Sequence, residues 1–543
     1  MIAALICLAP ASSLAGPDWS ANWSANWSEG VPIPPGGRPN PYGTPDSGEN
    51  SQYAHDVLRG KIHAQVYPVS VTGALPPYRP LAKVMAAISQ IRSLDDLFGW
   101  IGMHPYPEND ATGIYFAPRP DPAQAGPRMG VGLIETPDGT AFTLSCAECH
   151  SANLFGKTVL GMTNRFPRAN ETFVAAKIGS ELITDSMLRN FGDATDGEIR
   201  MFHRLREHLK SVGAKIPATI GLDTSLAQVA LSLARRNDDP YATPSADAAK
   251  NPRPEPLENQ VADSKPAVWW NVKYKDRWLS DGSVVAGSPI FTNLLWNEIG
   301  RGGDLVQLEN WFAENEGVIR ELTSAVFSAE APRFTDFFPP ERLSLDRAKH
   351  GESIFNQHCA GCHGTYEKAW SRSDAASLSP TQLLETTLVN YLQKTFVVDV
   401  GTDPGRYLGM TSLERDLNPL EISQKNGIVI RAQKGYVPPP LVGIWARWPY
   451  FHNNSAPTLC AVLTRHEDRP SGYYAGEAND PGTDFDLPCN GYPENRFGWS
   501  AYYDTAREGM SNSGHDEGIF LKNGEELLTS DEKSDLIVFL QTL

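Results

Sequence analysis

The sequence predicts a mainly α-helical protein in which two domains are surrounded by long irregular loops. Three observations lead to this prediction. The pattern Cys-x-x-Cys-His occurs twice, at residues 146–150 and 359–363; apolar residues recur at helical spacing in several segments; and Pro-rich stretches separate those segments. The chain has 543 residues, of which 41% are hydrophobic, which is enough for two large domains with sizeable cores.

The first residues have the composition of an export signal. Residues 1–15 are apolar and small, and Ser13 and Ala15 occupy the small-residue positions of a cleavage site before Gly16. We therefore expect a signal peptide over 1–15, although it lacks the usual basic start, and a periplasmic or secreted protein. Residues 16–51 repeat Trp-Ser-Ala-Asn and then become rich in Pro and Gly, which predicts a disordered leader. No later segment approaches about 18 uninterrupted apolar residues, so no transmembrane helix is expected.

The N-terminal domain is expected over residues 52–335. It contains the first Cys-x-x-Cys-His motif, an amphipathic helix over 196–212 and an Ala- and Leu-rich helix over 225–236. Residues 240–266 are polar and Pro-rich, which predicts a loop. Residues 267–301 are dense in aromatic side chains, most of which we expect to pack in the core.

The C-terminal domain is expected over residues 336–543, after a Phe- and Pro-rich crossover at 332–340. An amphipathic helix over 345–358 delivers Cys359 to the second motif. Another amphipathic helix, over 528–543, begins with Thr529 and Glu532 at capping-box spacing. We expect these two helices to pack across each other.

The two pentapeptides have the spacing of c-type haem attachment sites. Two thiols three positions apart each form a thioether to one porphyrin edge, and the following His supplies an imidazole to the iron. The residues assigned in this way to two covalent haems are Cys146, Cys149, His150, Cys359, Cys362 and His363. A thioredoxin-type site would be a lone Cys-x-x-Cys, and a four-thiolate zinc site would not need a His in each motif.

The remaining cysteines and the net charge narrow the alternatives. Cys460 and Cys489 are expected to form a disulfide, because an exported protein tends to pair its spare cysteines; two free thiols are the alternative. The net charge of -17 disfavours nucleic acid and anionic membrane surfaces as partners. A small redox protein or a neutral apolar molecule fits this charge better.

Three further segments resemble a known family. Residues 449–459 read Pro-Tyr-Phe-His-Asn-Asn-Ser-Ala-Pro-Thr-Leu. This resembles the Pro-Tyr-Phe-His-(Asp/Asn)-Gly-Ser-x-Pro-Thr-Leu signature of bacterial dihaem cytochrome c peroxidases and their relatives, with Asn454 in place of the usual Gly. The tail residues 513–518, Ser-Gly-His-Asp-Glu-Gly, and the Trp-rich residues 267–296 resemble the rubber-oxygenase branch of that superfamily.

The resemblance implies two cytochrome c-like haem domains with different tasks. One haem is six-coordinate and relays electrons, whereas the N-terminal haem keeps an open position for oxygen or peroxide. In the oxygenase branch the substrate is an apolar unsaturated chain such as polyisoprene, and related dihaem enzymes act on unsaturated fatty acids. The resemblance also allows a calcium ion between the domains.

The second iron ligand of the C-terminal haem is predicted from the same resemblance. His515 lies in the Gly-His tail motif and is the preferred candidate. His466 is the runner-up, because it follows His452 near the place where peroxidases of the superfamily carry a Met ligand, and Met510 is third. His452 itself is expected to be a structural residue near the domain interface.

The N-terminal haem has no obvious second ligand in the sequence. His203 and His208 are expected to be solvated residues of one helix. Glu298 is a candidate acid or base for peroxide cleavage, with an ion pair to Arg301 as the alternative. An oxygenase would instead line this site with apolar rings that hold an alkene and exclude water. The candidates for those rings are Trp269, Trp270, Trp278 and Phe291.

Three functions follow, in order of preference. The first is a dihaem c-type dioxygenase that acts on an apolar unsaturated substrate at the N-terminal haem. The second is a dihaem peroxidase that reduces hydrogen peroxide with electrons from a small redox protein. The third is an electron-transfer cytochrome without a substrate, for which 543 residues is a large scaffold.

Overall fold

The computed structural model describes residues 31–41, 75–88, 91–106, 128–494 and 501–543. The predicted signal peptide lies outside these residues, as do 16–30 and 42–51 of the predicted leader. Residues 31–41 belong to the expected disordered leader, yet they pack against the protein. The Ile33 side chain is buried and its amide donates to the Gln393 carbonyl, while the Arg38 amide donates to the Lys273 carbonyl. One apolar anchor and paired backbone groups therefore order this part of the leader.

The fold is mixed rather than mainly α-helical, because short hairpins occupy stretches that were expected to be irregular. Each sheet among the described residues has two antiparallel strands. The first hairpin turns through Pro137, Asp138 and Gly139, and the second turns at Phe155 and Gly156, which have φ of 52° and 81°. Pro137, Asp138, Gly139 and Gly156 are residues that favour tight turns, whereas Phe155 takes a positive φ that is uncommon for its type. The paired strands are β1 (Val131–Thr136) with β2 (Gly139–Leu144), β3 (Ser151–Leu154) with β4 (Lys157–Leu160), β5 (Val284–Ala286) with β8 (Val429–Ile430), β6 (Thr365–Lys368) with β7 (Thr386–Asn390), β9 (Gly472–Ala475) with β10 (Ala501–Asp504), and β11 (Leu521–Lys522) with β12 (Glu525–Glu526).

Helices dominate the N-terminal half. The predicted helices over 196–212 and 225–236 are present, the first opened by a capping box of Thr195 and Glu198. Within 267–301 the chain forms a 3-10 helix, a short strand and one α-helix. The helices of this half are α4 (Tyr78–Ile88), α5 (Leu94–Ile101), α6 (Ala169–Leu182), α7 (Asp185–Asn190), α8 (Asp196–Leu209), α9 (Ser225–Leu233), α10 (Ala246–Lys250), η4 (Trp269–Tyr274), α11 (Pro289–Gly300), α12 (Leu305–Glu314) and α13 (Glu316–Ser328).

The C-terminal half contains the predicted pair of crossed helices. Gly351 lies at the crossing, where an added Cβ would meet the Asp535 carbonyl oxygen at 2.1 Å, and Phe355 packs on Phe539 with ring centroids 5.2 Å apart. Only glycine permits so close an approach of two helix backbones. The helices of this half are α14 (Leu345–His358), α15 (Ala360–His363), α16 (Pro380–Leu383), α17 (Gly405–Leu417), α18 (Glu421–Lys425), α19 (Leu459–Val462) and α20 (Ser530–Leu540), so α14 and α20 form the crossed pair.

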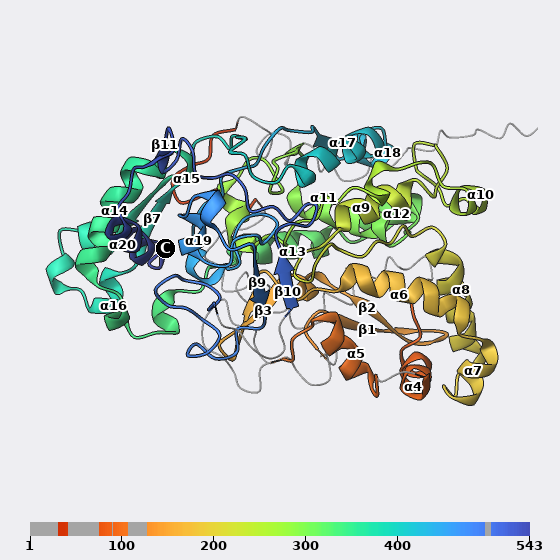
Figure 1. Cartoon of the computed structure of the whole chain (residues 1–543). Helices are drawn as coiled ribbons and strands as arrows, with labels where there is room; N and C mark the ends of the chain where they lie inside the picture. The colour runs from red at the N-terminus through yellow and green to blue at the C-terminus, as the bar shows by residue number, and fades with distance from the viewer. Residues whose placement is uncertain (1–30, 42–74, 89–90, 107–127, 495–500) are drawn as a thin grey trace, which may run out of the picture.

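The two halves are interlocked, and the chain does not divide cleanly at residue 335. In Figure 1, α14 and α20 lie at one end of the molecule, whereas α17 and α18 lie near α9 and α12 at the other. Residues of α17 and β8 share one apolar core with α9, α11 and α12, and β8 pairs with β5. The segment 405–430 therefore belongs structurally to the N-terminal half.

Two cations, Arg165, which is buried, and Lys265, which is half-buried, join the halves at and just before the Pro-Tyr-Phe-His motif. The Arg165 guanidinium donates to the carbonyls of Ala446 and Trp448 and stacks 4.3 Å over the Trp448 ring. The Lys265 ammonium donates to the Pro449 carbonyl at 2.6 Å. Because these cations come from the N-terminal half and their acceptors from the C-terminal half, the motif forms part of the interface.

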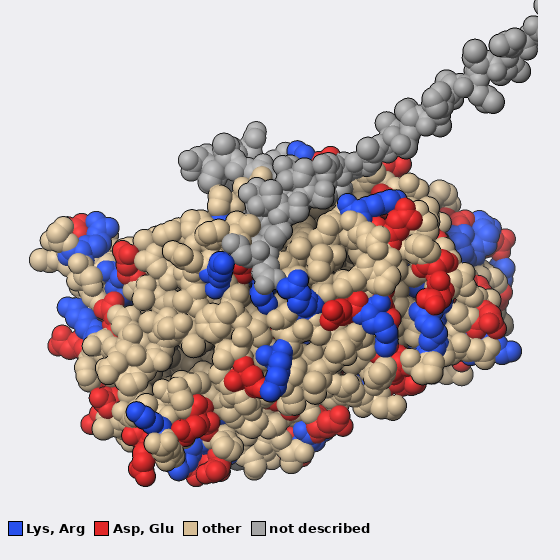
Figure 2. Space-filling view, turned by 90° about the horizontal axis from the view of Figure 1, so that it is seen from above, with Lys and Arg blue, Asp and Glu red and all other residues tan. Residues whose placement is uncertain are grey.

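The surface shows charges of both signs without one dominant patch on the face in Figure 2. Acidic and basic side chains alternate there around a broad uncharged area. In the described ranges no helix has both the length and the apolar character needed to cross a bilayer.

Candidate haem sites

The first Cys-x-x-Cys-His motif forms a tight turn between two hairpins. Cys146–Glu148 is a 3-10 turn that follows β2, and the His150 amide donates to the Cys146 carbonyl. The His150 Nδ1 lies 2.8 Å from the Ala267 carbonyl oxygen. Because a carbonyl only accepts, Nδ1 carries the hydrogen and Nε2 is left as the metal-binding nitrogen. Burial lowers the pKa of His150 to about 4, so the ring is neutral and able to bind a metal.

Apolar side chains surround this motif. Trp269 lies against the His150 ring with centroids 5.6 Å apart. It belongs to a buried cluster with Met129, Leu160 and Val326, and Cys146 packs at the edge of this cluster. Among the described residues, no histidine ring contacts that of His150. The first site therefore has one imidazole and an apolar neighbourhood.

Two buried carboxyl groups lie near the first motif. Glu148, inside the motif, is 3% exposed, and burial raises its pKa to about 8. Glu298 on α11 is 2% exposed, and within the described structure neither carboxyl oxygen has a hydrogen-bond partner; burial raises its pKa to about 7. The Arg301 charge opposes both shifts, and its guanidinium donates to the Leu144 carbonyl beside the motif. Both carboxyl groups are therefore able to exchange a proton near neutral pH.

The second motif lies opposite another imidazole. His363 ends α15, and its Nδ1 lies 2.8 Å from the Pro439 carbonyl oxygen, which again leaves Nε2 for a metal. The ring centroids of His363 and His515 are 6.4 Å apart. A metal between two imidazoles needs bonds of about 2 Å, and each nitrogen lies roughly 1.1 Å from its ring centroid, which requires a separation of about 6 Å. The two rings are therefore spaced to hold one metal ion between them.

The backbone of the tail motif brings His515 to this place. Gly514 has φ of 72°, and an added Cβ would meet the Gly401 carbonyl carbon at 2.3 Å. The His515 amide donates to the Val400 carbonyl, and His515 itself has φ of 57°. Burial lowers the pKa of His515 to about 3, so this ring is also neutral. The close backbone approach to residues 400–401 thus requires glycine at position 514.

The other candidate ligands lie elsewhere. His466 is half-exposed, and its Nδ1 lies 2.7 Å from Asp516 Oδ2. Met510 is fully buried, and its carbonyl accepts from the Tyr503 hydroxyl. The His452 ring stacks on the Tyr436 ring with centroids 4.0 Å apart, a contact that suits a structural role. Of the three candidates, His515 is the one whose ring contacts that of His363.

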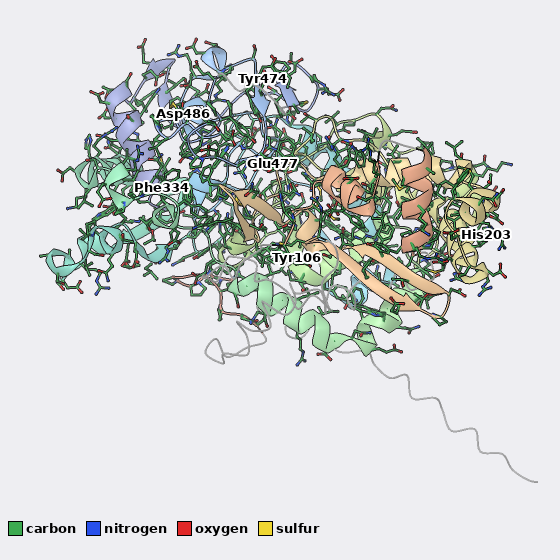
Figure 3. All side chains as sticks on the ribbon, turned by 90° about the horizontal axis from the view of Figure 1, so that it is seen from below. Tyr106, His203, Phe334, Tyr474, Glu477 and Asp486 are labelled. Atoms are coloured by element: carbon green, nitrogen blue, oxygen red, sulfur yellow. A yellow bond between two sulfur atoms is a disulfide. The ribbon has the colours of Figure 1, made fainter. Side chains whose placement is uncertain are left out.

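The two helical histidines of α8 differ from each other. His203 is exposed and pairs with Asp185 at 2.7 Å, as expected, and Figure 3 shows it at the periphery of the molecule. His208 is half-buried, unlike the solvated residue that was expected. Its ring lies where a Cβ on Gly302 would meet Nε2 at 3.1 Å, and burial lowers its pKa to about 4. The turn after α11 covers this ring, which helical periodicity alone does not reveal.

The structure brings only part of the predicted aromatic set to the first motif. Trp269 contacts His150, as described above. Trp270 points instead into the core shared by both halves, and its indole N–H donates to the Val442 carbonyl at 2.9 Å. Trp278 and Phe291 lie in the neighbouring core of α9, α11 and α17, whose edge Cys146 also touches. Successive residues of a 3-10 helix point in different directions, which explains why Trp269 and Trp270 separate.

The cysteines fit covalent haem attachment. Cys146, Cys149, Cys359 and Cys362 are not in disulfides, whereas Cys460 and Cys489 form a disulfide with an S–S distance of 2.11 Å. Each motif thus offers two thiols and one neutral imidazole whose Nδ1 is already bonded. This donor set fits a c-type haem at each motif. The described residues contain no cluster of three or more acidic, His or Cys side chains that could hold a metal ion, so they give no support to the expected calcium site.

Comparison with known proteins supports a link to the cytochrome c family. Residues 435–474, which include the Pro-Tyr-Phe-His motif, match a family described as RoxA-like, cytochrome c-like. Two uncharacterised proteins of Sinorhizobium fredii (strain NBRC 101917 / NGR234) are similar to this chain. Protein y4iJ is 25% identical over 356 residues, covering 53% of this chain and 56% of the relative. Protein y4iM is 26% identical over 228 residues, which cover 38% of this chain and 52% of the relative. The chain thus spans about half the length of the curated relatives it matches.

Sequence reasoning missed several residues of these sites. Glu148 occupies a variable position of the motif, and its burial follows from the closeness of Gly130, whose added Cβ would meet the Glu148 amide nitrogen at 2.7 Å. The run Pro438-Pro439-Pro440 is visible in the sequence, but its contact with His363 depends on the tertiary fold. Asn271, between the two halves, carries no sequence signal.

Proposed function

We propose that this protein is an exported c-type oxidoreductase with two covalent haems. Cys146, Cys149 and His150 hold the first haem. Cys359, Cys362 and His363 would hold the second haem, and His515 would also bind its iron. The observation that carries the proposal is the difference between the two sites: one imidazole faces a second imidazole, whereas the other lies among apolar side chains.

We further propose that the first haem oxidises an apolar unsaturated substrate, such as polyisoprene or an unsaturated fatty acid, with dioxygen. A haem bound at the first motif would supply the oxygen chemistry that side chains lack. The hydrogen bond from His150 Nδ1 to the Ala267 carbonyl fixes the orientation of the imidazole, and the Trp269 ring limits its movement. The apolar cluster of Met129 and Leu160 beside Cys146 favours an apolar ligand and excludes water.

Measurements of haem content and of iron ligation test the proposal that two covalent haems are bound. Purified protein is expected to yield two haems per chain that remain attached after denaturation, and Cys-to-Ser changes in one motif should remove one of them. In electron paramagnetic resonance, His515→Ala should convert the low-spin signal of one haem to high spin, whereas His466→Ala should leave it low-spin. A low-spin signal that survives His515→Ala would reject His515 as the ligand.

Isotope tracing tests the oxygenase. The reduced protein is mixed anaerobically with polyisoprene or an unsaturated fatty acid and then exposed to oxygen-18. Labelled carbonyl or peroxide groups are expected in the product. Unlabelled product, or no product from either substrate, would rule out this activity while leaving the haem assignment untouched.

Glu298 favours a second candidate function, a dihaem peroxidase. A buried carboxyl group without a hydrogen-bond partner and with a pKa raised to about 7 suits proton transfer between the oxygens of a peroxide. This function predicts turnover of a reduced small redox protein by hydrogen peroxide, with a large loss in Glu298→Gln. An inactive peroxide assay with a reduced haem donor would exclude it.

A further inference from the structure

The two motif histidines share one mode of support. His150 Nδ1 bonds to the Ala267 carbonyl and His363 Nδ1 bonds to the Pro439 carbonyl, each at 2.8 Å. Ala267 precedes η4, and Pro439 lies in a run of three prolines. These two segments come from different halves of the chain, yet they lie against each other.

The run Pro438–Pro440, which we call the proline strut, holds its carbonyls rigidly. Proline fixes φ and has no N–H, so the strut has no backbone donors of its own. Each carbonyl is instead bound by a side chain. The Tyr391 hydroxyl donates to Pro438, His363 Nδ1 to Pro439, and the Asn271 amide to Pro440 at 3.1 Å. The carbonyl that supports His363 is therefore adjacent to one that is bound from the other half.

Asn271 and Trp270 bind η4 to this strut. The Asn271 Nδ2 donates to Pro440, and the Trp270 indole N–H donates to Val442 at 2.9 Å. Asn271 is 5% exposed, and in the described structure its Oδ1 has no hydrogen-bond partner. A buried acceptor left without a partner costs about 1–3 kcal/mol. An apolar side chain at position 271 would avoid that cost. The hydrogen bond that the Asn271 amide donates therefore has to explain why this residue is an asparagine.

We propose that Asn271 is a positioning residue that couples the two proximal histidines. The connected path runs from His150 through the Ala267 carbonyl, along the chain to Asn271, across to Pro440, and through Pro439 to His363. This inference rests on the proposed haem attachment, but it does not depend on whether the substrate is an alkene or a peroxide.

The coupling has a direct chemical consequence. A hydrogen bond from Nδ1 to a carbonyl makes the other ring nitrogen a more basic ligand and fixes the ring orientation. A shift of η4 against the strut changes this bond at His150 and at His363 together. The Arg447 guanidinium also donates to Pro440, at 2.9 Å, so loss of Asn271 loosens the strut without leaving its carbonyl unbound.

The test uses the full chain with both haems attached. Asn271→Leu removes the amide donor and the unpartnered oxygen while keeping the branch at Cγ, and Trp270→Phe removes the second donor. Asn426→Leu is the matched control, because Asn426 is also buried and donates to a single backbone carbonyl, that of Ile422. Redox titration followed by absorbance gives the midpoint potential of each haem, and electron paramagnetic resonance reports the ligand field of each ferric iron.

In Asn271→Leu, we expect the ferric-to-ferrous ratio at a fixed potential to change severalfold at both haems, where a tenfold change equals about 59 mV for one electron. Trp270→Phe should move both haems in the same direction, and Asn426→Leu should move neither. Unchanged potentials, a change at one haem alone, or an equal change in the control would overturn the coupling. A wild-type chain without covalent haem would instead overturn the proposed function, and the coupling with it.

Discussion

Replacement of Gly351 by Ala should open the crossing of α14 and α20 that supports the second motif. The added Cβ would lie 2.1 Å from the Asp535 carbonyl oxygen and 2.8 Å from the Phe539 Cβ, whereas ordinary contact begins at 3.4 Å. The helices must therefore separate by the difference, 3.4 − 2.1 = 1.3 Å. This movement weakens the Phe355–Phe539 packing and the ion pair of Arg347 with Asp535.

The free energy of unfolding should fall by about 2 kcal/mol, which is the upper overpacking cost reduced by the helix preference of Ala. Overpacking of this kind costs roughly 1–3 kcal/mol, and more when the obstacle is backbone, as it is here. Against this, Ala is favoured over Gly in a helix by about 1 kcal/mol. Gly179→Ala in α6 isolates that second effect, because nothing lies within 4 Å of its added Cβ. Gly179→Ala should therefore raise the free energy of unfolding slightly.

Guanidinium unfolding of the full chain, followed by circular dichroism, measures the difference. The Gly351→Ala midpoint should lie below wild type and the Gly179→Ala midpoint at or above it. If both variants have the same midpoint, the close crossing does not limit stability, and the reasoning from backbone distance fails.

Three other substitutions give clear expectations. Lys368 is buried, and burial lowers its pKa to about 7 from an ordinary value of 10.5. The folded chain therefore binds fewer protons than the unfolded chain between pH 7 and 10.5, so this residue makes stability rise with pH in that window, by at most about 1.4 kcal/mol per pH unit. In thermal unfolding experiments, Lys368→Met should make the rise of stability with pH less steep. An unchanged slope of stability against pH would refute this prediction. Arg165→Met should cost about 2–4 kcal/mol and speed proteolysis between the halves, because three carbonyls lose a charged donor. Replacement of Cys460 and Cys489 by Ser opens a loop of 29 residues and should cost about 3 kcal/mol by chemical denaturation; an unchanged midpoint would count against the chain-entropy account.

Much of the local structure could be predicted from the sequence. The helix over 345–358 was predicted with its observed bounds, because an amphipathic pattern ends at a motif cysteine. The Thr529 capping box is present at α20 for a similar local reason. The hairpins around Pro137–Gly139 and Phe155–Gly156 were not predicted from the sequence, which indicated only long irregular loops besides the helices.

Long-range placement accounts for the predictions that failed. Trp269 and Trp270 are adjacent and chemically alike, yet one contacts His150 and the other packs between the halves. His208 has helical neighbours that suggest solvent, but the turn at Gly302 covers it. In each case the deciding contact comes from a segment far along the chain, which local periodicity does not report.

The sequence alone determined the donor set of each motif, because Cys-x-x-Cys-His sets thiols and an imidazole on one short turn whatever the surroundings. Tertiary structure alone decided which distant groups meet each imidazole: His515 opposite His363, Trp269 beside His150, and Asn271 between their supports. The physical reason is one of range. The donors of each motif lie within five consecutive residues, so the sequence sets their spacing. The surroundings of the imidazole depend on packing and hydrogen bonds between segments more than a hundred residues apart, such as those of His363 and His515.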